Sequence, residues 1–221
     1  MPFDSSSDLK AEIGHVLFID IVGYSKLLIN EQSELLEHLN GMVRGSEQVR
    51  AAEAEGKLIR LATGDGMALV FRNSPEAPAQ CALELSRADK EHPELQLRMG
   101  IHSGPINEVI DVNERANVTG AGINMAQRVM DCGDAGHILL SKRAADDLAQ
   151  YRHWRPLLHD LCEVEVKHWF VVSLVHLHPD AAGHPALPEQ LRQTSETAAA
   201  FTSSAPRRQT LIGARLHFLG L

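Results

Sequence analysis

An apolar run near the start of the chain predicts a strand that is buried on both faces. Residues 15–20 read His-Val-Leu-Phe-Ile-Asp, in which four consecutive apolar positions lead into a carboxylate. A carboxylate at the rim of a core is costly unless a cation or hydrogen bonds hold it. We therefore expect Asp20 to have a partner elsewhere in the chain.

A second pair of apolar runs, within residues 57–71, predicts a β-hairpin. Gly64-Asp65-Gly66 interrupts the two runs as a tight turn would. Asp20 and Asp65, presented at a strand end and a turn, could share one or two Mg²⁺ ions, since this hard cation prefers oxygen ligands. The alternative is structural: Asp20 caps the following helix, and Asp65 simply occupies its turn.

Helical spacing of apolar residues predicts helices between these strands. Leu35, Leu36, Leu39 and Met42 recur at this spacing, in one broken helix or two short ones that end near residues 54–56. Three further helices are expected, at residues 74–89, 123–130 and 142–150. A serine stands at the start of three of the predicted helical regions, and we predict each of these serines as an N-cap: Ser33, Ser74 and Ser141.

Apolar and polar residues alternate over residues 95–101, which is the period of a half-buried strand. Residues 102–105 should end or bend it, and an extended arm or loop should follow at 106–118. A strand at 137–141 and a last hairpin within 164–177 complete the pattern. The resulting order predicts an α+β fold, with a ferredoxin-like βαββαβ core, extra C-terminal β/α elements and helices covering a mostly antiparallel sheet.

The expected organisation is one domain with a polar extension at each end. Residues 1–11 are Ser-rich and read as a flexible leader, and residues 12–178 hold the domain. Residues 179–221 are rich in Ala, Pro, Ser, Thr and Gln, and indicate a linker or disordered tail with an apolar end.

Composition narrows the possible partners and locations. The net charge of −8, with no basic patch standing out, argues against a nucleic-acid partner. No apolar run is long enough to span a bilayer, and no export signal is visible, so we expect a cytoplasmic protein. The widely spaced cysteines Cys81, Cys132 and Cys162 read as reduced core thiols. His176 and His178 are expected to face solvent.

Three ordered motifs carry a resemblance to a known family. They are Phe-Ile-Asp-Ile-Val-Gly-Tyr-Ser at 18–25, Gly-Asp-Gly at 64–66 and Asn-Met-Ala-Gln-Arg at 124–128. Together they resemble the catalytic domain of class III adenylate/guanylate cyclases, over roughly residues 12–178. The resemblance implies the same fold, and a nucleotide cyclase that converts ATP, or GTP, to a 3′,5′-cyclic nucleotide and pyrophosphate in intracellular signalling.

The resemblance also implies roles for particular residues. Asp20, Asp65 and the carbonyl of Ile21 would hold two Mg²⁺ or Mn²⁺ ions. Asn124 would orient the ribose, and Arg128 would stabilise charge on the α-phosphate. Without the family, Asn124 and Arg128 lie on one helical face that could equally be its solvated side.

Phosphate binding would fall to two further segments. The matching lysine, Lys167, would contact the β- and γ-phosphates, and a lone surface lysine is the alternative. The turn that contains Gly23, Tyr24 and Ser25 joins a strand to a helix, and its backbone amides could bind a triphosphate. The alternative is an ordinary strand–helix turn with no ligand.

The base-reading positions depart from the family pattern. Leu61 stands where adenylate cyclases have a lysine, while Arg60 should point to the other face of its strand. Asn117, with Thr119 close by, stands where an Asp or Thr is usual. A leucine cannot hydrogen-bond a purine, so another residue reads the base or selectivity is weak.

The family builds each site from two chains, which implies a homodimer with two equivalent sites at the interface. The departures at Leu61 and Asn117 favour an alternative: a catalytically silent cyclase-like domain that binds a nucleotide or a partner. A third possibility, a nucleotidyl-transferring enzyme on a related palm-like core, should show basic nucleic-acid contacts, and the acidic balance opposes it.

Overall fold

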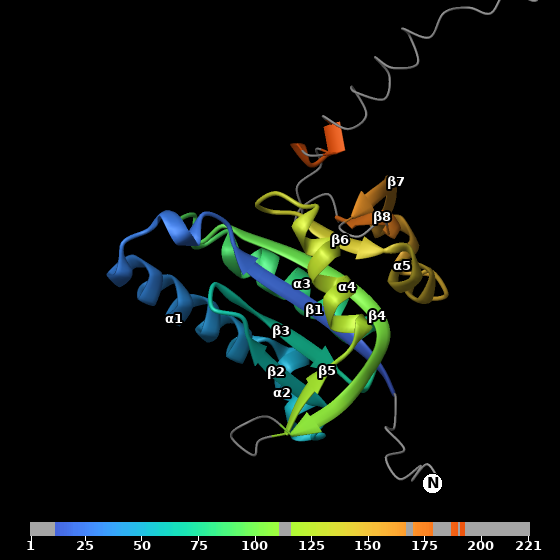
Figure 1. The fold of residues 1–221 in the computed structure, drawn as a ribbon, viewed down its shortest axis with the longest axis horizontal. Helices are drawn as coiled ribbons and strands as arrows, with labels where there is room; N and C mark the ends of the chain where they lie inside the picture. The colour runs from blue at the N-terminus through green and yellow to red at the C-terminus, as the bar shows by residue number, and fades with distance from the viewer. Residues whose placement is uncertain (1–11, 111–115, 167–169, 179–186, 190, 193–221) are drawn as a thin grey trace, which may run out of the picture.

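A computed structural model describes residues 12–110, 116–166, 170–178, 187–189 and 191–192 (Figure 1). In this part of the chain the strands form one sheet in the order β2-β3-β1-β4-β6-β8-β7, with β5 paired to the far end of β4. Neighbouring strands are antiparallel except β4 and β6. The strands are β1 (Glu12–Ile21), β2 (Leu58–Ala62), β3 (Gly66–Phe71), β4 (Leu97–Ile110), β5 (Ala116–Thr119), β6 (Ile138–Ser141), β7 (Leu158–Val166) and β8 (Phe170–Leu177).

Helices cover both faces of this sheet. The α-helices are α1 (Ile29–Gly45), α2 (Glu47–Ala54), α3 (Glu76–Asp89), α4 (Ala121–Asp131) and α5 (Lys142–Leu148), with 3-10 turns at Tyr24–Lys26 and Arg155–Leu157. Apolar residues of α1, α2, α3 and α5 share one core cluster with the sheet, whereas those of α4 pack in two other clusters. The order β4-β1-β3-β2 with its crossing helices confirms the ferredoxin-like core.

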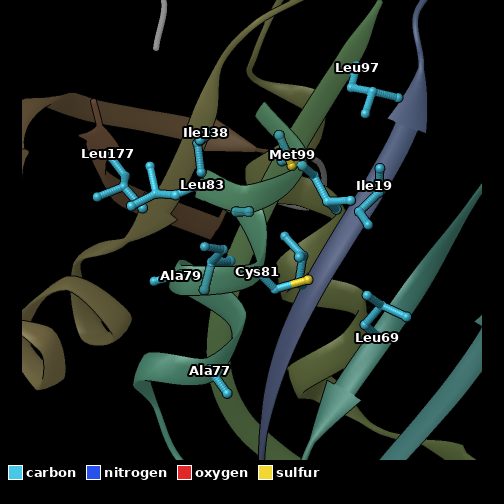
Figure 2. Packing of buried hydrophobic residues seen from close by; sticks show 14 of the residues in the cluster. Ile19, Leu69, Ala77, Ala79, Cys81, Leu83, Leu97, Met99, Ile138 and Leu177 are labelled. Carbon is cyan, nitrogen blue, oxygen red and sulfur yellow. The ribbon is translucent and has the colours of Figure 1, made fainter. Parts of the chain in front are cut away.

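Strand β1 is buried on both faces, as its apolar run predicts. Leu17 and Ile19 belong to the larger cluster, which also contains residues of α3. Figure 2 shows Ile19 of β1 in this cluster together with Cys81 and Leu83 of α3. Val16 and Phe18 point the other way and pack in the cluster that contains Met130 of α4. Since alternate residues of a strand share a face, Asp20 continues the Val16 and Phe18 row, on the α4 side.

A glycine lets α4 lie close against β4. A Cβ atom at Gly100 would sit 2.4 Å from the amide nitrogen of Met130 and 2.5 Å from the carbonyl oxygen of Ala126. Because any side chain here would push the helix away, Gly100 fixes the position of the last turns of α4 over the sheet.

Several predicted elements are confirmed with small shifts. The β2–β3 hairpin and the broken helix are present, and the Ser141 hydroxyl accepts a hydrogen bond from the Ala144 amide at 3.4 Å. The predicted cap Ser74 is off by one residue: Pro75 is the N-cap of α3, which begins at Glu76, and the Ser74 hydroxyl accepts a hydrogen bond from the Glu76 amide at 3.1 Å.

The prediction of Ser33 as an N-cap is wrong. Helix α1 begins four residues earlier, at Ile29, and the Glu31 carboxylate accepts a hydrogen bond from the Leu28 amide at 2.8 Å. Ser33 lies inside the helix, where its hydroxyl donates to the Ile29 carbonyl at 3.0 Å. A carboxylate reaching back to a free amide thus replaces the expected serine.

Strand β4 does not end at residues 102–105 but continues to Ile110. There it forms a two-stranded arm with β5, so the extended arm expected at 106–118 is partly a hairpin. On β4, only Met99 to Ile101 pair with β6. Pro105 lies beyond this stretch, so its backbone does not need hydrogen bonds to strands on both sides. A proline is tolerated at such a position.

The expectation that His176 faces solvent is wrong. This side chain is 2% exposed, because β8 lies between β6 and β7 and pairs with both. Cys81 and Cys132 are buried free thiols, as expected. In the described segments no helix has the length and apolar character needed to cross a bilayer. Lys167, the side chain of Cys162, the predicted leader at 1–11 and most of the predicted tail lie outside the described residues. The described tail residues, 187–189 and 191–192, are ordered against the domain: Leu191 is buried in a core cluster, and the Glu189 amide donates to Oδ2 of Asp134 at 2.8 Å.

Candidate functional site

Asp20 ends the buried part of β1 opposite Arg98 of β4. The two residues are direct partners in the antiparallel register, and both Nε and Nη2 of Arg98 contact Oδ2 of Asp20, at 2.8 and 2.7 Å. The Asp20 side chain is 9% exposed and that of Arg98 is 26% exposed. This two-point contact explains how the strand tolerates a carboxylate at the core boundary.

Asp65 is held beside the same strand end by its own backbone. Its carbonyl accepts a hydrogen bond from the Ile21 amide at 3.1 Å. Gly64 has a positive φ of 98°, and a Cβ at Gly66 would lie 2.0 Å from the Ile19 carbonyl oxygen. The glycines on both sides of Asp65 therefore permit the turn and its close approach to β1.

The electrostatics of Asp20 reflect this arrangement. Burial raises the pKa of the Asp20 carboxyl, the Arg98 guanidinium opposes that rise, and the nearby Asp65 carboxylate adds to it. Two neighbouring carboxylates also attract a cation. As a pair of hard oxygen donors they fit Mg²⁺ or Mn²⁺, so this part of the predicted metal site is chemically consistent.

The turn after β1 is fixed by backbone hydrogen bonds. The Val22 amide donates to the Gln96 carbonyl at 2.8 Å, and Gly23 has a positive φ of 81°. Tyr24 begins a short 3-10 helix and packs against the larger core cluster, whereas Gly23 and Ser25 are exposed. The predicted phosphate-binding turn therefore lies at the same end of β1 as Asp20.

Helix α4 directs Asn124 and Arg128 away from its packed side. Asn124 is exposed and Arg128 is half-buried, at helical spacing on the side opposite Ala126. Further along, Oδ1 of Asp131 lies 3.7 Å from Nη2 of Arg98, so the helix end touches the site. Asn124 stands seven residues earlier, about 10 Å back along the helix axis.

The predicted base-reading residues lie on different parts of the sheet. Leu61 packs against the α4-side cluster, on the same face as Asp20, and Arg60 turns to the opposite face to pair with Glu53, as expected. Asn117 accepts a hydrogen bond from the Val118 amide at 2.8 Å. Thr119 pairs with Asn107, nine residues beyond Arg98 on β4, so β5 reaches well away from Asp20.

Sequence reasoning missed Arg98 as a site residue. It was visible only as one polar position in an alternating strand, and its pairing with Asp20 depends on the register between β1 and β4. The approach of Asp131 to Arg98 likewise follows from how closely α4 packs.

Comparisons with known proteins agree with this geometry. The sequence profile of the Adenylate and Guanylate cyclase catalytic domain family matches residues 10–168. A search of curated proteins finds no significant match.

Solved cyclase structures are similar in fold. The guanylate cyclase domain of RhGC from Catenaria anguillulae, in complex with GTP, has 21% identity and a TM-score of 0.61, over 78% of this chain and 98% of that one. The adenylyl cyclase CyaB from P. aeruginosa has 19% identity and a TM-score of 0.61, over 80% and 100%. An adenylate/guanylate cyclase/hydrolase from Silicibacter pomeroyi has 24% identity and a TM-score of 0.59, over 77% and 99%.

Proposed function

Because the chain belongs to the class III adenylate and guanylate cyclase catalytic domain family, we propose that it is an active nucleotide cyclase. It converts a purine nucleoside triphosphate to the 3′,5′-cyclic nucleotide and pyrophosphate, as a signalling enzyme of the cytoplasm. The observation that carries the proposal is that Asp20, Asp65 and Arg98 come together at the C-terminal end of β1.

Asp20 and Asp65 would hold the metal ions, together with the carbonyl of Ile21. Mg²⁺ or Mn²⁺, two per site, would lower the pKa of the ribose 3′ hydroxyl and neutralise charge on the leaving pyrophosphate. Arg98 is placed to compensate the Asp20 charge and to present its remaining N–H donors to a phosphate oxygen. Gly23, Tyr24 and Ser25 would supply amides to the triphosphate, and Lys167 a further positive charge.

The outward direction of Asn124 and Arg128 supports a site shared by two chains. Neither side chain needs to reach its own Asp20 if a partner offers the same carboxylates across an interface. In such a homodimer Asn124 orients the ribose, and the guanidinium of Arg128 stabilises the charge that develops on the α-phosphate. A monomer is then inactive.

The residues at the base-reading positions do not by themselves select one purine base. Leu61, partly buried in an apolar cluster, offers no hydrogen bond to a purine, so Asn117 or Thr119 would have to contribute through the dimer. We propose ATP as the preferred substrate and GTP as the second. The same Leu61 environment favours a second candidate function, a silent cyclase-like domain that binds a nucleotide without turning it over.

Mixing two inactive variants tests the shared site. Asp65→Ala removes a metal ligand, and Arg128→Ala removes the transition-state cation. Each variant alone should lose activity by at least about a hundredfold. In an equal mixture half of the dimers carry one chain of each kind, and each of these has one intact site. The mixture should therefore recover about a quarter of the wild-type rate.

A control pair separates mixing from other effects. When Asp20→Ala is mixed with Asp65→Ala, every chain lacks one of the two metal ligands that a single chain must supply, so no intact site can form and the rate should stay at background. If the Asp65→Ala and Arg128→Ala mixture also stays at background while co-purification of differently tagged chains shows mixed dimers, the shared-site proposal is wrong. Wild-type binding of nucleotide without product would instead favour the silent domain.

A further inference from the structure

Outside the candidate active site, two histidines and a glutamate meet on the surface beside α1. His38 lies on α1, and His92 and Glu94 lie on the loop between α3 and β4. Oε1 of Glu94 is 3.2 Å from Nδ1 of His92 and 3.6 Å from Nδ1 of His38. The two imidazole rings have centroids 5.1 Å apart. One carboxylate oxygen thus lies against two imidazole nitrogens from separate segments.

We propose that His38, His92 and Glu94 form a binding site for one transition-metal ion of the Zn²⁺ class. Two imidazoles and a carboxylate are a recurrent ligand set for zinc, with water in the fourth position. The ligand atoms lie within 4.8 Å of one another. Metal–ligand bonds of about 2.0–2.1 Å at tetrahedral angles require ligand atoms about 3.4 Å apart. Two of the distances already bracket that value.

The two segments that carry the ligands are anchored by buried neighbours. Leu39 follows His38 and is 0% exposed, and Leu95 follows Glu94 and is 1% exposed. The Leu95 amide also donates to the His92 carbonyl at 2.9 Å, which closes a turn across both loop ligands. The ligand atoms are therefore held near each other before any ion arrives, so little ordering is needed for binding.

A further carboxyl group, that of Asp89, lies close to this cluster. Asp89, at the end of α3, interacts electrostatically with both His92 and Glu94. Its Oδ1 atom is buried and has no hydrogen-bond partner among the described residues. A cation bound by His92 and Glu94 would interact favourably with this carboxyl group in its ionised form.

The site differs in chemistry from the Asp20 and Asp65 pair. Imidazole nitrogens favour Zn²⁺, Co²⁺ or Ni²⁺, whereas Mg²⁺ binds oxygen donors. Binding would join α1 to the segment that leads into β4, because His38 lies on the helix and the other ligands lie on the loop. The proposal does not depend on cyclase activity.

Titration with Zn²⁺ and Co²⁺ in excess Mg²⁺ tests the site directly. Mg²⁺ occupies oxygen-ligand sites, and the readouts are competition with a chromophoric zinc chelator and the visible absorption of bound Co²⁺. We expect one equivalent of strongly bound ion in the wild-type chain. Affinity should fall at least tenfold in His38→Gln, in His92→Gln and in Glu94→Gln.

The matched control is His153→Gln. His153 also pairs with a glutamate, at 3.0 Å from Oε2 of Glu76, and is exposed, but this pair is not part of a three-ligand group in the described chain. This variant should bind as the wild type does. If a change at His38 disturbs α1, Glu94→Gln still tests the site, because Glu94 lies in an exposed loop. Circular dichroism of each variant shows whether it keeps the wild-type fold.

Stability provides an independent readout. At a free Zn²⁺ concentration about 100 times the dissociation constant, the wild-type melting temperature should rise by about 5–10 °C, and the His38→Gln melting temperature should not. The proposal is overturned if the wild type binds no Zn²⁺ or Co²⁺. It is equally overturned if the three ligand variants bind as tightly as His153→Gln.

Discussion

Replacing Arg98 by methionine should destabilise the fold by leaving the Asp20 carboxylate without its cation. Methionine keeps much of the length of the arginine side chain and removes both contacts to Oδ2. Removing one partner of a buried ion pair costs about 3–5 kcal/mol. Arg98 keeps a quarter of its side chain exposed, so we expect the lower end, about 3 kcal/mol. With an m-value of about 2 kcal/mol/M, the urea midpoint should fall by about 1.5 M at pH 7.5.

The loss should depend on pH in a defined direction. The pKa of Asp20 is already raised by burial, and removing Arg98 should raise it further, since the guanidinium favours the ionised form. Ionised Asp20 therefore lowers stability at pH values above its folded pKa. That penalty disappears as the pH falls toward the unfolded value near 3.8, where the carboxyl is protonated. The variant's deficit should consequently shrink between pH 7.5 and pH 4.5.

Arg72→Met is the matched control for this experiment. The Arg72 side chain is 28% exposed, slightly more than that of Arg98, but its partners Glu12 and Glu108 are 33% and 59% exposed, against 9% for Asp20. Its loss should be less than about 1 kcal/mol, as for surface ion pairs. Adding Asp20→Asn to Arg98→Met should recover most of the lost stability. Equal losses in the two arginine variants, or no recovery with Asp20→Asn, would refute the reasoning.

Three further predictions concern the turn, a thiol and the base. Gly66→Ala should lower the free energy of unfolding, measured by urea titration, by at least about 2 kcal/mol, because the added Cβ would meet the Ile19 carbonyl. Gly64→Ala should cost less, about 1 kcal/mol, because only its positive φ opposes the substitution. Burial raises the pKa of the Cys81 thiol to about 12, so peptide mapping after iodoacetamide treatment at pH 8 should find Cys81 unlabelled in the folded chain and labelled in urea. Leu61→Lys should raise kcat/KM for ATP relative to GTP about tenfold or more, measured by product formation, and an unchanged ratio would remove Leu61 from the base site.

The sequence predicted those parts of the fold that depend on local pattern. The both-face burial of β1, the Gly-Asp-Gly turn and the break between α1 and α2 each follow from residues close in the chain. Ser33 was assigned as a cap because serine is a common one, yet the competing Glu31 contact to the Leu28 amide begins the helix earlier.

Features that depend on distant pairing could not be read from the sequence. Arg98 reaches Asp20 only because β1 and β4 pair in one register, across 78 residues of chain. His176 is buried on β8, which is an inner strand because β7 pairs along its outer side. Nothing in the residues next to His176 indicates that β7, and not β8, is the edge strand. The metal pair was predicted from the strand-end and turn positions of Asp20 and Asp65 and then from the family resemblance, and the structure adds the contacts that hold Asp65 beside β1.

The most direct test of the central claim is a turnover measurement. The purified chain, concentrated enough to dimerise, is incubated with ATP or GTP and with Mn²⁺ or Mg²⁺, and cyclic nucleotide and pyrophosphate are measured by mass spectrometry. We predict equal amounts of both products, from ATP in preference to GTP, and their loss in Asp65→Ala. Nucleotide binding without either product, under all metal conditions, would contradict the claim that this site is catalytic.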